Sequence, residues 1–333
     1  MLRELDIPLF NCKVTENYVV VCGGGGNVDF GIENGIIIID ENNKHHHYKT
    51  DEIVIKVEVI ETNKKLIIAG IGNFNFYLIS FEDSKFNLIS QMKAEVKKVY
   101  LSDMLIILFD DGEVHSYSDV KKVSDLNDKS LFNDIKKDSQ YMSYKCQSDD
   151  QIVKFVNKED KIVIPSEIFN FYIRNNYFYR IGYTNGQSSL IINDDMFSYK
   201  GGIEIIEFFK GIPIFYMKGS PTSKLFIGSD EFKFHKITDL AINEEFVGIS
   251  TVNGEIHIFK YHLPVEKVRK LTTIKVSNLP VTGISLKEKH VFYSLLSGKV
   301  GKEYVEKNNF NFYILNTMIV LIIAIIIGIY FKK

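Results

Sequence analysis

Short apolar runs, each ended by a turn, make up most of this chain. Two of them, at 18–22 and 36–39, lie near the N-terminus and are rich in valine and isoleucine. Runs of this length and β-branched content are typical of buried strands. The same pattern predicts strands at 54–60, 66–70, 74–79, 96–101, 105–109, 113–117, 169–173, 177–182, 190–193, 203–209, 213–217, 225–228, 246–250, 255–260, 281–286 and 291–295. Outside the C-terminus no long helical period occurs, and 125–138 reads as a loop or a short helix, so the pattern predicts an all-β protein.

A short repeated motif groups these strands. The segments 109–115 and 251–257 each place a strand, a turn glycine and a second strand in the same order, and 295–300 does so more loosely. The glycines Gly254 and Gly298 are 44 positions apart, close to the roughly 40 to 45 residues of a WD-type propeller blade. The motif therefore favours a β-propeller over a sandwich or a barrel.

The number of blades depends on how the middle of the chain is divided. Gly112 and Gly254 are 142 positions apart, which makes three intervals of blade length or four shorter ones, and the pair Asn185-Gly186 favours four. The spacing thus predicts seven or eight four-stranded blades and does not choose between them. We expect residues 2–7 to supply the last strand of the blade that holds 291–304, because closure of this kind removes the open edges of the ring.

The C-terminus has a different pattern. No charged residue occurs between 308 and 331, and 313–331 is a nearly continuous apolar run of 19 residues, interrupted by Asn316 and Thr317. At about 1.5 Å per residue a helix of this length crosses a hydrocarbon core of roughly 30 Å. A buried core helix is the alternative, but length without charge favours a single transmembrane helix that acts as a tail anchor. We expect a propeller at 1–306, a linker at 307–312, the anchor at 313–331 and a lumenal end at 332–333.

Composition and charge limit the classes of function. The formal net charge of −2 gives no basic face for phosphates, so we expect no nucleic-acid partner. The three cysteines, Cys12, Cys22 and Cys146, share no metal-ligand spacing, which fits a reducing compartment. The first residues alternate charged and apolar side chains and lack the apolar core of a signal peptide, so we expect the propeller to stay in the cytosol.

A glycine-rich segment separates the first two predicted strands. It is longer than an ordinary hairpin turn, and consecutive glycines lose more backbone entropy than a plain turn requires. We interpret it as a functional loop. Its residues are Gly23, Gly24, Gly25, Gly26, Asn27, Val28, Asp29, Phe30, Gly31, Ile32, Glu33 and Asn34.

Two nucleotide-binding interpretations of this loop fail. Gly26 and Gly31 have the spacing of a phosphate-binding loop, but Ile32 and Glu33 stand where lysine and serine or threonine are required. A dinucleotide fingerprint needs a helix after its glycines, and 36–39 is a predicted strand. The loop therefore does not read as a phosphate site.

The sequence was also searched for features of a cation site and of a covalent catalytic site, namely oxygen ligands in the loop, histidines and nucleophile motifs. Asn27, Asp29, Glu33 and Asn34 offer hard oxygen ligands for a cation, but their spacing matches no EF-hand pattern, so the sequence alone favours a solvated polar loop. The histidines at 45–47 lie in a polar stretch that we expect to be a loop, and adjacent loop histidines rarely converge on one metal. No nucleophile motif occurs, and the paired acids sit at turn positions where aspartate is favoured. The sequence gives no argument for covalent chemistry.

The loop also carries a resemblance to a known family. Four glycines at the end of a first-blade strand, a short insert, and then Gly31-Ile32-x-Asn34 before an apolar strand closely resemble the Sec-twelve family of membrane-anchored exchange factors of the COPII coat. Residues 279–286 resemble the last blade of that family, and the predicted anchor follows, as in the family. The resemblance spans the chain, but only the loop is specific, because the middle blades match by pattern alone.

The resemblance implies a fold and a function. It implies a seven-bladed WD-type β-propeller with a single C-terminal transmembrane helix, facing the cytosol from the endoplasmic reticulum membrane, while the spacing leaves eight blades open. The implied function is guanine-nucleotide exchange on a Sar-type small GTPase, without covalent chemistry. A tail-anchored scaffold for coat or tethering proteins, without exchange activity, is the alternative.

The resemblance also assigns roles within the loop. It implies that the loop contacts the GTPase and holds a potassium ion. The residues expected to contact the GTPase are Gly31, Ile32, Glu33 and Asn34. The residues expected to form the loop base are Gly23, Gly24, Gly25 and Gly26. The candidate potassium ligands are Asn27, Asp29 and Asn34.

Overall fold

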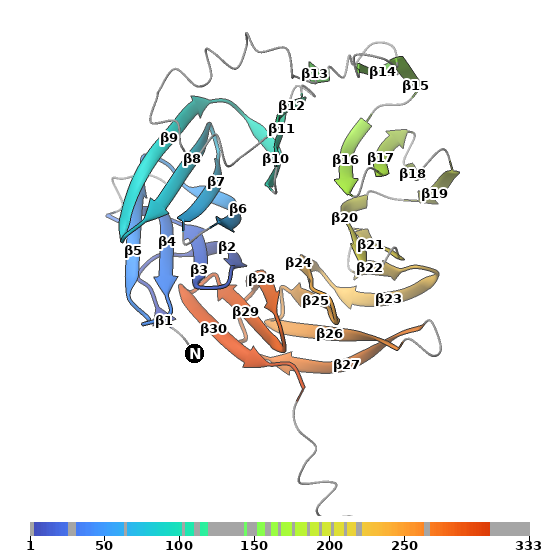
Figure 1. Cartoon of the computed structure of the whole chain (residues 1–333). Coiled ribbons are helices and arrows are strands. Elements are labelled where there is room, and N and C mark those ends of the chain that lie inside the picture. Colours follow the sequence, from blue (N-terminus) through green and yellow to red (C-terminus); the bar gives the residue numbers. More distant parts are fainter. Residues whose placement is uncertain are drawn as a thin grey trace, which may run out of the picture.

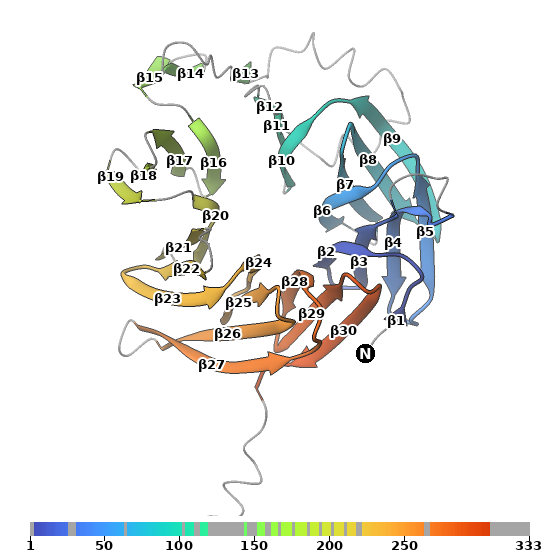
Figure 2. The ribbon, with the colours of Figure 1, turned by 180° about the vertical axis from the view of Figure 1, so that it is seen from behind.

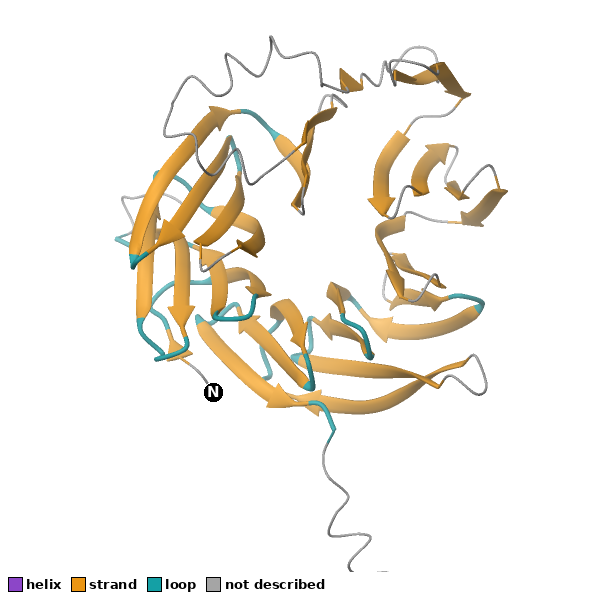
Figure 3. Ribbon diagram, viewed as in Figure 1, coloured by secondary structure: helices purple, strands orange, loops and turns teal. Residues whose placement is uncertain are grey.

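The architecture comes from a computed structural model. It describes residues 3–25, 31–62, 65–101, 104–109, 114–118, 143–144, 152–156, 161–165, 168–174, 177–184, 187–192, 195–200, 203–209, 212–217, 222–262 and 267–306. Within these ranges all regular structure is β-strand (Figure 3). No helix long and apolar enough to cross a membrane occurs in the described part of the chain. The predicted anchor at 313–331 and the polar stretch at 125–138 lie outside it.

Consecutive strands pair antiparallel into sheets of four. The first two sheets contain β2 (Leu9–Val14), β3 (Tyr18–Gly23), β4 (Asn34–Asp40) and β5 (His45–Thr50), then β6 (Val54–Thr62), β7 (Lys65–Gly72), β8 (Asn75–Glu82) and β9 (Lys85–Lys93). A third contains β10 (Val96–Leu101), β11 (Met104–Phe109), β12 (Val114–Ser118) and β13 (Ser143–Tyr144), and a two-stranded pair, β14 (Ile152–Val156) and β15 (Lys161–Pro165), follows.

The second half of the chain repeats the arrangement. Its sheets contain β16 (Ile168–Arg174), β17 (Tyr177–Thr184), β18 (Gln187–Ile192) and β19 (Asp195–Lys200), then β20 (Ile203–Phe209), β21 (Ile212–Met217), β22 (Thr222–Ile227) and β23 (Asp230–His235). The next contains β24 (Ile237–Ile242), β25 (Phe246–Thr251), β26 (Glu255–His262) and β27 (Lys267–Lys275), and the last contains β28 (Val281–Lys287), β29 (His290–Leu295), β30 (Lys299–Tyr304) and β1 (Arg3–Glu4).

The sheets stand around a common axis with the first strand of each nearest the centre (Figures 1 and 2). This is the arrangement of a β-propeller, so the prediction of that fold is confirmed. The ring closes as expected, because β1 from the N-terminus pairs with β30, with Arg3 opposite Val300 and Glu4 opposite Lys299. We call this junction of the N-terminal segment with β30 the seam. The backbone N–H of Leu5 adds a further hydrogen bond to it by donating to the carbonyl of Gly298 at 3.0 Å.

The core lies between neighbouring sheets. In β3, alternate residues face opposite sides: Val20 packs in the cluster shared with β6–β8, and Val21 in the cluster shared with the last sheet. The same alternation recurs in β7, where Ile68 faces the first sheet and Ile67 faces β10 and β11. Burial of one such side chain stabilises the fold by about 1.5–3 kcal/mol. The first and second sheets are therefore each held by both of their neighbours.

The first strand of every four-stranded sheet carries the same irregularity. Its register shifts between its first and third residues, which are Leu9/Asn11, Val54/Lys56, Val96/Lys98, Ile168/Asn170, Ile203/Ile205, Ile237/Asp239 and Val281/Gly283. Bulges of this kind re-aim side chains and increase twist. The two-stranded pair of β14 and β15 has no such shift.

Side chains near these bulges link neighbouring sheets around the axis. The amide oxygen of Asn11 accepts from Val57 N–H at 3.3 Å, and the carboxylate of Asp239 accepts from Ile284 N–H at 2.9 Å. Across the seam, Ser285 Oγ accepts from the N–H of Val14 at 3.1 Å. These bonds satisfy backbone donors that no strand of the same sheet reaches.

The strands missed from the sequence are mainly the outermost ones. The histidines at 45–47 were expected in a loop, but they form the start of β5, so that expectation was wrong. β9 and β23 were missed for the same reason, because their burial alternates along the strand and leaves no continuous apolar run. A strand with one solvated face reads as polar when its partner is unknown.

Gly298 and Gly31 form a matched pair for testing the seam. Both have a positive φ, +87° and +69°, which alanine adopts at a cost of about 1–2 kcal/mol. A Cβ at Gly298 would also lie 2.1 Å from the Leu5 carbonyl oxygen, whereas at Gly31 it meets no atom of the described residues within 4 Å. We expect Gly298→Ala to lower the urea unfolding midpoint clearly more than Gly31→Ala. Equal midpoints would contradict a close approach at the seam.

Candidate functional site

The glycine loop leaves the first sheet between its second and third strands. Gly23 ends β3 and pairs with Gly35 near the start of β4. The next residue, Gly24, donates its N–H to the Pro8 carbonyl at 3.0 Å. A Cβ at Gly23 would lie 1.8 Å from that same carbonyl oxygen. The glycines at the loop base therefore let the segment before β2 pack directly against the loop.

Asn34 and Ile32 complete the base from the other side. The structure places Asn34 in β4, where its side chain is only 4% exposed. A Cβ at Gly24 would come within 2.0 Å of Asn34 Oδ1, and a Cβ at Gly25 within 2.4 Å of Ile32 Cβ. Asn34 thus belongs to the buried base and not to the exposed tip.

The described part of the tip consists of three exposed residues. Gly31 has a φ of +69°, and no atom of the described residues would lie within 4 Å of a Cβ added to it. Ile32 is 36% exposed, so part of its apolar side chain is open to solvent. Glu33 is exposed as well. Gly26 and the insert at 27–30 lie outside the described residues. Of the expected contact residues, Gly31, Ile32 and Glu33 are thus presented to solvent together.

Lys49 and His47 from β5 hold Glu33. Lys49 Nζ forms an ion pair with one carboxylate oxygen, and His47 Nδ1 lies 3.2 Å from the other. The hydrogen bond from Lys49 holds the pKa of Glu33 below its usual range, so the carboxylate stays ionised at neutral pH. Burial lowers the pKa of His47, although the charge of Glu33 opposes that effect. Sequence reasoning missed this contact because it placed the histidines in a loop.

The loop base fits a cation in part. Potassium is held by oxygen atoms, and Asn34 supplies a buried amide oxygen beside the side-chain-free backbone of Gly24. The other two candidate ligands, Asn27 and Asp29, lie outside the described residues. Among the residues the structure describes, no cluster of three or more histidine, cysteine or acidic side chains is arranged for a metal ion.

The strand order gives the ring two distinct faces. Because strands in a sheet alternate in direction, the connection from second to third strand lies on the same face as the connection to the next sheet. We call this the loop face; it contains the glycine loop and the connections at 5–8, 51–53, 73–74, 94–95, 252–254, 276–280 and 296–298. The opposite face is the exit face; it contains the turns at 15–17, 41–44, 83–84, 228–229, 243–245 and 288–289.

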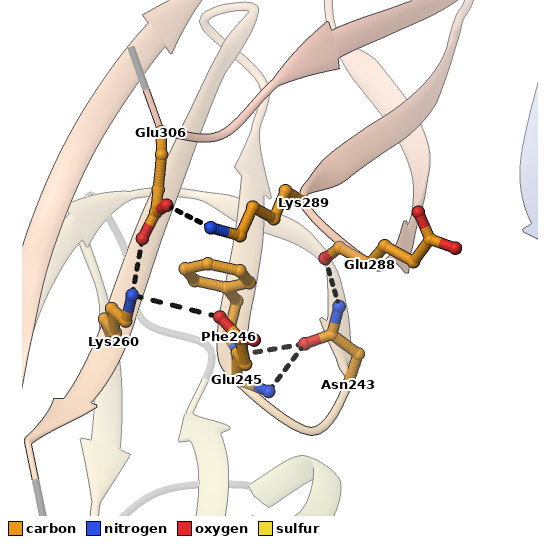
Figure 4. A network of polar contacts seen from close by, with 7 residues as sticks. All are labelled: Asn243, Glu245, Phe246, Lys260, Glu288, Lys289 and Glu306. Carbon is orange, nitrogen blue, oxygen red and sulfur yellow. Dashed lines mark hydrogen bonds and ion pairs between the residues drawn. The ribbon is translucent and has the colours of Figure 1, made fainter. Parts of the chain in front are cut away.

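The chain leaves the ring on the exit face. After β30 the N–H of Val305 donates to the Lys289 carbonyl at 2.9 Å, within a turn of that face. Glu306 pairs with Lys260 and, at 2.8 Å, with Lys289 (Figure 4). The hydrogen bonds from Lys260 and then Lys289 hold the pKa of Glu306 below its usual range. Residue 306 is therefore fixed on the face opposite to the glycine loop.

Hydrogen bonds of Asn243 hold the neighbouring turn at 243–245, between β24 and β25. Asn243 Oδ1 accepts from the N–H groups of Glu245 and Phe246, and its Nδ2 donates to the Glu288 carbonyl at 2.8 Å (Figure 4). Lys260 Nζ also lies 5.2 Å from the centre of the Phe246 ring, within the range of a cation–π contact. The contacts join the last two sheets where the chain departs.

Comparisons with known proteins identify the fold only. No protein-family profile and no curated protein matches the chain. Among solved structures, the chain is similar to the computationally designed Ika8 protein, with a TM-score of 0.60 and 13% identity over 91% of this chain and 98% of the other. It is similar to Sqt1 of Saccharomyces cerevisiae, with a TM-score of 0.61 and 13% identity over 91% and 97%.

A third similar structure is a chain of the mitotic checkpoint complex, with a TM-score of 0.58 and 11% identity over 92% of this chain and 91% of the other. Sqt1 and the similar chain of the mitotic checkpoint complex are WD40 β-propeller proteins. The similarity therefore shows that the chain has a WD40-like β-propeller fold.

The contact between Glu33 and His47 can be tested by titration. Glu33→Gln removes a negative charge that favours protonated His47, so the pKa of His47 should fall further below the ordinary histidine value of about 6.5. An NMR titration of the imidazole signals measures this pKa, and His47→Gln assigns the resonance. Because neutral His47 is favoured in the folded state, its contribution to stability should fall as the pH drops below about 6.5. An unchanged or raised pKa in Glu33→Gln would contradict the contact.

Proposed function

We propose that this protein is a guanine-nucleotide exchange factor for a Sar-type small GTPase. In this proposal it is anchored in the endoplasmic reticulum membrane by residues 313–331, keeps its propeller in the cytosol and starts assembly of the COPII coat. The observation that carries the proposal is the glycine loop. It combines the sequence resemblance to the Sec-twelve family with an exposed Ile32 and Glu33 on a tightly packed base.

An exchange factor acts by binding the nucleotide-free GTPase more tightly than the loaded one. The linkage between the two ligands then lowers the affinity of the GTPase for its nucleotide. Such coupling requires a rigid platform and a projecting group. The ring is the platform, and Ile32 is the apolar group that inserts into the GTPase. Glu33, kept ionised by Lys49, places negative charge beside it and opposes the phosphates of the nucleotide.

The proposal includes a ring of seven blades. Each four-stranded sheet of the described residues begins with the same register shift, which supports equivalent positions around one axis. The pair of β14 and β15 lacks the shift and has two strands, so we assign it to an insertion between blades. An eight-bladed ring would instead need this pair to be an incomplete blade.

The position of residue 306 supports membrane attachment through the exit face. An anchor that follows this residue leaves the ring opposite to the glycine loop, so the loop face stays open to a cytosolic partner. Attachment also raises the local concentration of exchange activity where the coat forms. The alternative function, a scaffold for coat or tethering proteins, uses the same platform but does not accelerate nucleotide release.

Replacement of Ile32 tests the proposed insertion. An isoleucine buried at an interface contributes about 1.5–3 kcal/mol, so Ile32→Ala should slow nucleotide release roughly ten- to hundredfold. Release of a fluorescent GDP analogue from the GTPase, with the full chain in detergent micelles, measures the effect. Thermal stability should change little because Ile32 is already 36% exposed.

Leu88→Ala is the matched control. Leu88 has the same 36% exposure but lies in the outer strand β9, away from the loop. It should exchange nucleotide at the wild-type rate. Wild-type activity of Ile32→Ala would remove Ile32 from the site, and a wild-type chain without any exchange activity would favour the scaffold function.

Potassium dependence tests the proposed ion. If potassium holds the loop through oxygen atoms that include Asn34, replacing it with sodium at constant ionic strength should slow exchange by the wild-type chain. Spontaneous release from the GTPase alone, measured in both salts, is the control for effects on the GTPase. Equal catalysed rates in potassium and sodium would show that the ion has no role.

A further inference from the structure

A small cavity opens on the exit face between the first sheet and the last sheet, which are neighbours across the seam (Figure 1). It has a volume of about 240 Å³, far more room than a single water molecule needs. The turns at 15–17 and 41–44 line it from the first sheet, and residues of β28, β29 and β30 line it from the last sheet. A molecule bound in this cavity would therefore touch both sheets.

The buried part of the cavity lining is apolar. Val19, Ile39 and Phe292 line it, and each of these side chains is at most 8% exposed. All three belong to the core cluster that fills the space between the first and last sheets. The cavity therefore ends on the packed core of the seam, which gives a bound molecule an apolar surface to rest on.

The charged residues that line the cavity are divided by sheet. Those from the first sheet are all acidic, namely Glu16, Asp40 and Glu41. Those from the last sheet are both basic, namely Lys287 and Lys302. We call these two sets the acidic wall and the basic wall. Glu16, Glu41 and Lys302 are exposed and the other two are half-buried, so both walls are open to a molecule from solution.

The two walls do not neutralise each other. Within the described residues, neither Lys287 nor Lys302 forms an ion pair with a carboxylate. Lys287 Nζ donates instead to the backbone carbonyl of Glu16, and Lys302 Nζ lies 5.2 Å from the centre of the Phe292 ring. Opposite charges thus face each other across the cavity without direct contact, and both remain to be compensated by a ligand.

Hydrogen bonds hold the turn at 41–44 in place. Asp40 Oδ1 accepts from the N–H of Asn42 at 3.0 Å and from the N–H of Lys44 at 2.9 Å. Arg3 Nη1 donates to the carbonyl of Asn43 at 3.1 Å and ties the turn to the seam. Asp40 thus uses its carboxylate to fix the turn, which leaves the neighbouring Glu41 to face a ligand.

The turn at 15–17 is fixed in the same way. The N–H of Thr15 donates to the Tyr18 carbonyl at 2.9 Å, and the N–H of Asn17 donates to the carboxylate of Glu61 at 3.1 Å. Among the described residues, no hydrogen bond or ion pair engages the carboxylates of Glu16 and Glu41. The acidic wall therefore presents two available carboxylates on two rigid turns, and the cavity is formed before a ligand enters it.

We propose that this cavity binds a zwitterionic phosphodiester, a group that carries a phosphate and an ammonium. The phosphate lies against Lys287 and Lys302, and the ammonium lies against Glu16 and Glu41. An ion with a single charge would compensate one wall and be repelled by the other, whereas a zwitterion compensates both. A phosphodiester suits the basic wall because its two anionic oxygens accept hydrogen bonds from two lysines at once.

The position of the cavity indicates the source of the ligand. It opens on the face where Glu306 leaves the ring, so the membrane of the proposed function lies on its side. The head group of a zwitterionic phospholipid, such as phosphatidylethanolamine, carries both charges and is abundant at such a surface. This choice of source rests on the membrane attachment in the proposed function, whereas the site and its charge preference do not. A soluble phosphodiester zwitterion is the other source of the same chemistry.

Calorimetric titration of the full chain in micelles of an uncharged maltoside detergent tests the proposal. Glycerophosphoethanolamine is the soluble probe, and dihexanoyl phosphatidylethanolamine is the lipid probe. Both should bind, and the lipid should bind at least as tightly. Dimethyl phosphate and ethanolamine, which carry one charge each, should bind roughly tenfold more weakly. Glycine, a zwitterion without phosphate, should also bind more weakly.

Single charge removals locate the site. Lys302→Gln and Glu41→Gln should each weaken binding of glycerophosphoethanolamine roughly three- to tenfold. Both side chains are exposed, so the urea unfolding midpoints should stay close to that of the wild type. Lys44→Gln and Glu244→Gln are the matched controls, because both residues are exposed in exit-face turns but do not line the cavity. They should bind like the wild type.

Four results would overturn the inference. They are no binding of either probe by the wild type, dimethyl phosphate or glycine binding as tightly as glycerophosphoethanolamine, wild-type binding by both Lys302→Gln and Glu41→Gln, and equal losses in the two controls. Binding of the soluble probe without the lipid would overturn the membrane source.

The outcomes are separate from those of the proposed function. Because the cavity lies on the exit face, Lys302→Gln should catalyse nucleotide exchange at the wild-type rate. Head-group binding by a chain without exchange activity would overturn the exchange function and leave the site standing. Exchange activity in a chain that binds neither probe would overturn the site alone.

Discussion

In the central strands of this protein, successive residues are buried on alternating sides of the sheet, so a sheet without a neighbour would expose about half of its core to water. Val20 and Val21 illustrate this, because each faces a different adjoining sheet. Only a closed ring gives every such sheet two neighbours. Closure depends on a short contact, the pairing of Arg3–Glu4 in β1 with β30. The few hydrogen bonds at the seam therefore keep both faces of the first and last sheets buried.

The glycine loop depends on the same seam. The segment that runs from β1 to β2 passes under the loop, and the Pro8 carbonyl accepts from Gly24. The same segment thus closes the ring, through Leu5 and Gly298, and positions the base of the loop, through Pro8 and Gly24. A loop base fixed in this way loses little entropy when the protein binds a partner, which is the advantage of a rigid platform over a flexible segment. In the proposed exchange function, that rigidity lets binding energy act on the nucleotide site of the partner.

The division into two faces organises the proposed functions. Alternating strand directions place the glycine loop and its apolar neighbours on one face and the departure of the chain on the other. Glu306 fixes that departure through Lys260 and Lys289. A protein attached to a membrane through the exit face presents the loop face to the cytosol.

The sequence by itself determined most of the first three strands of each sheet, the propeller class, the closing segment and the glycine loop, but it missed the innermost strands β2 and β24. Each of the features that it determined has a local signal, such as a continuous apolar run or consecutive glycines. The outer strands were missed, because β5 and β23 contain only half-buried and exposed residues, and their polar side chains read as loops. Only the tertiary structure decided the environment of the site. It placed Asn34 in the buried base and Lys49 and His47 on Glu33, because these contacts depend on strand register and on neighbouring sheets, which no local pattern specifies.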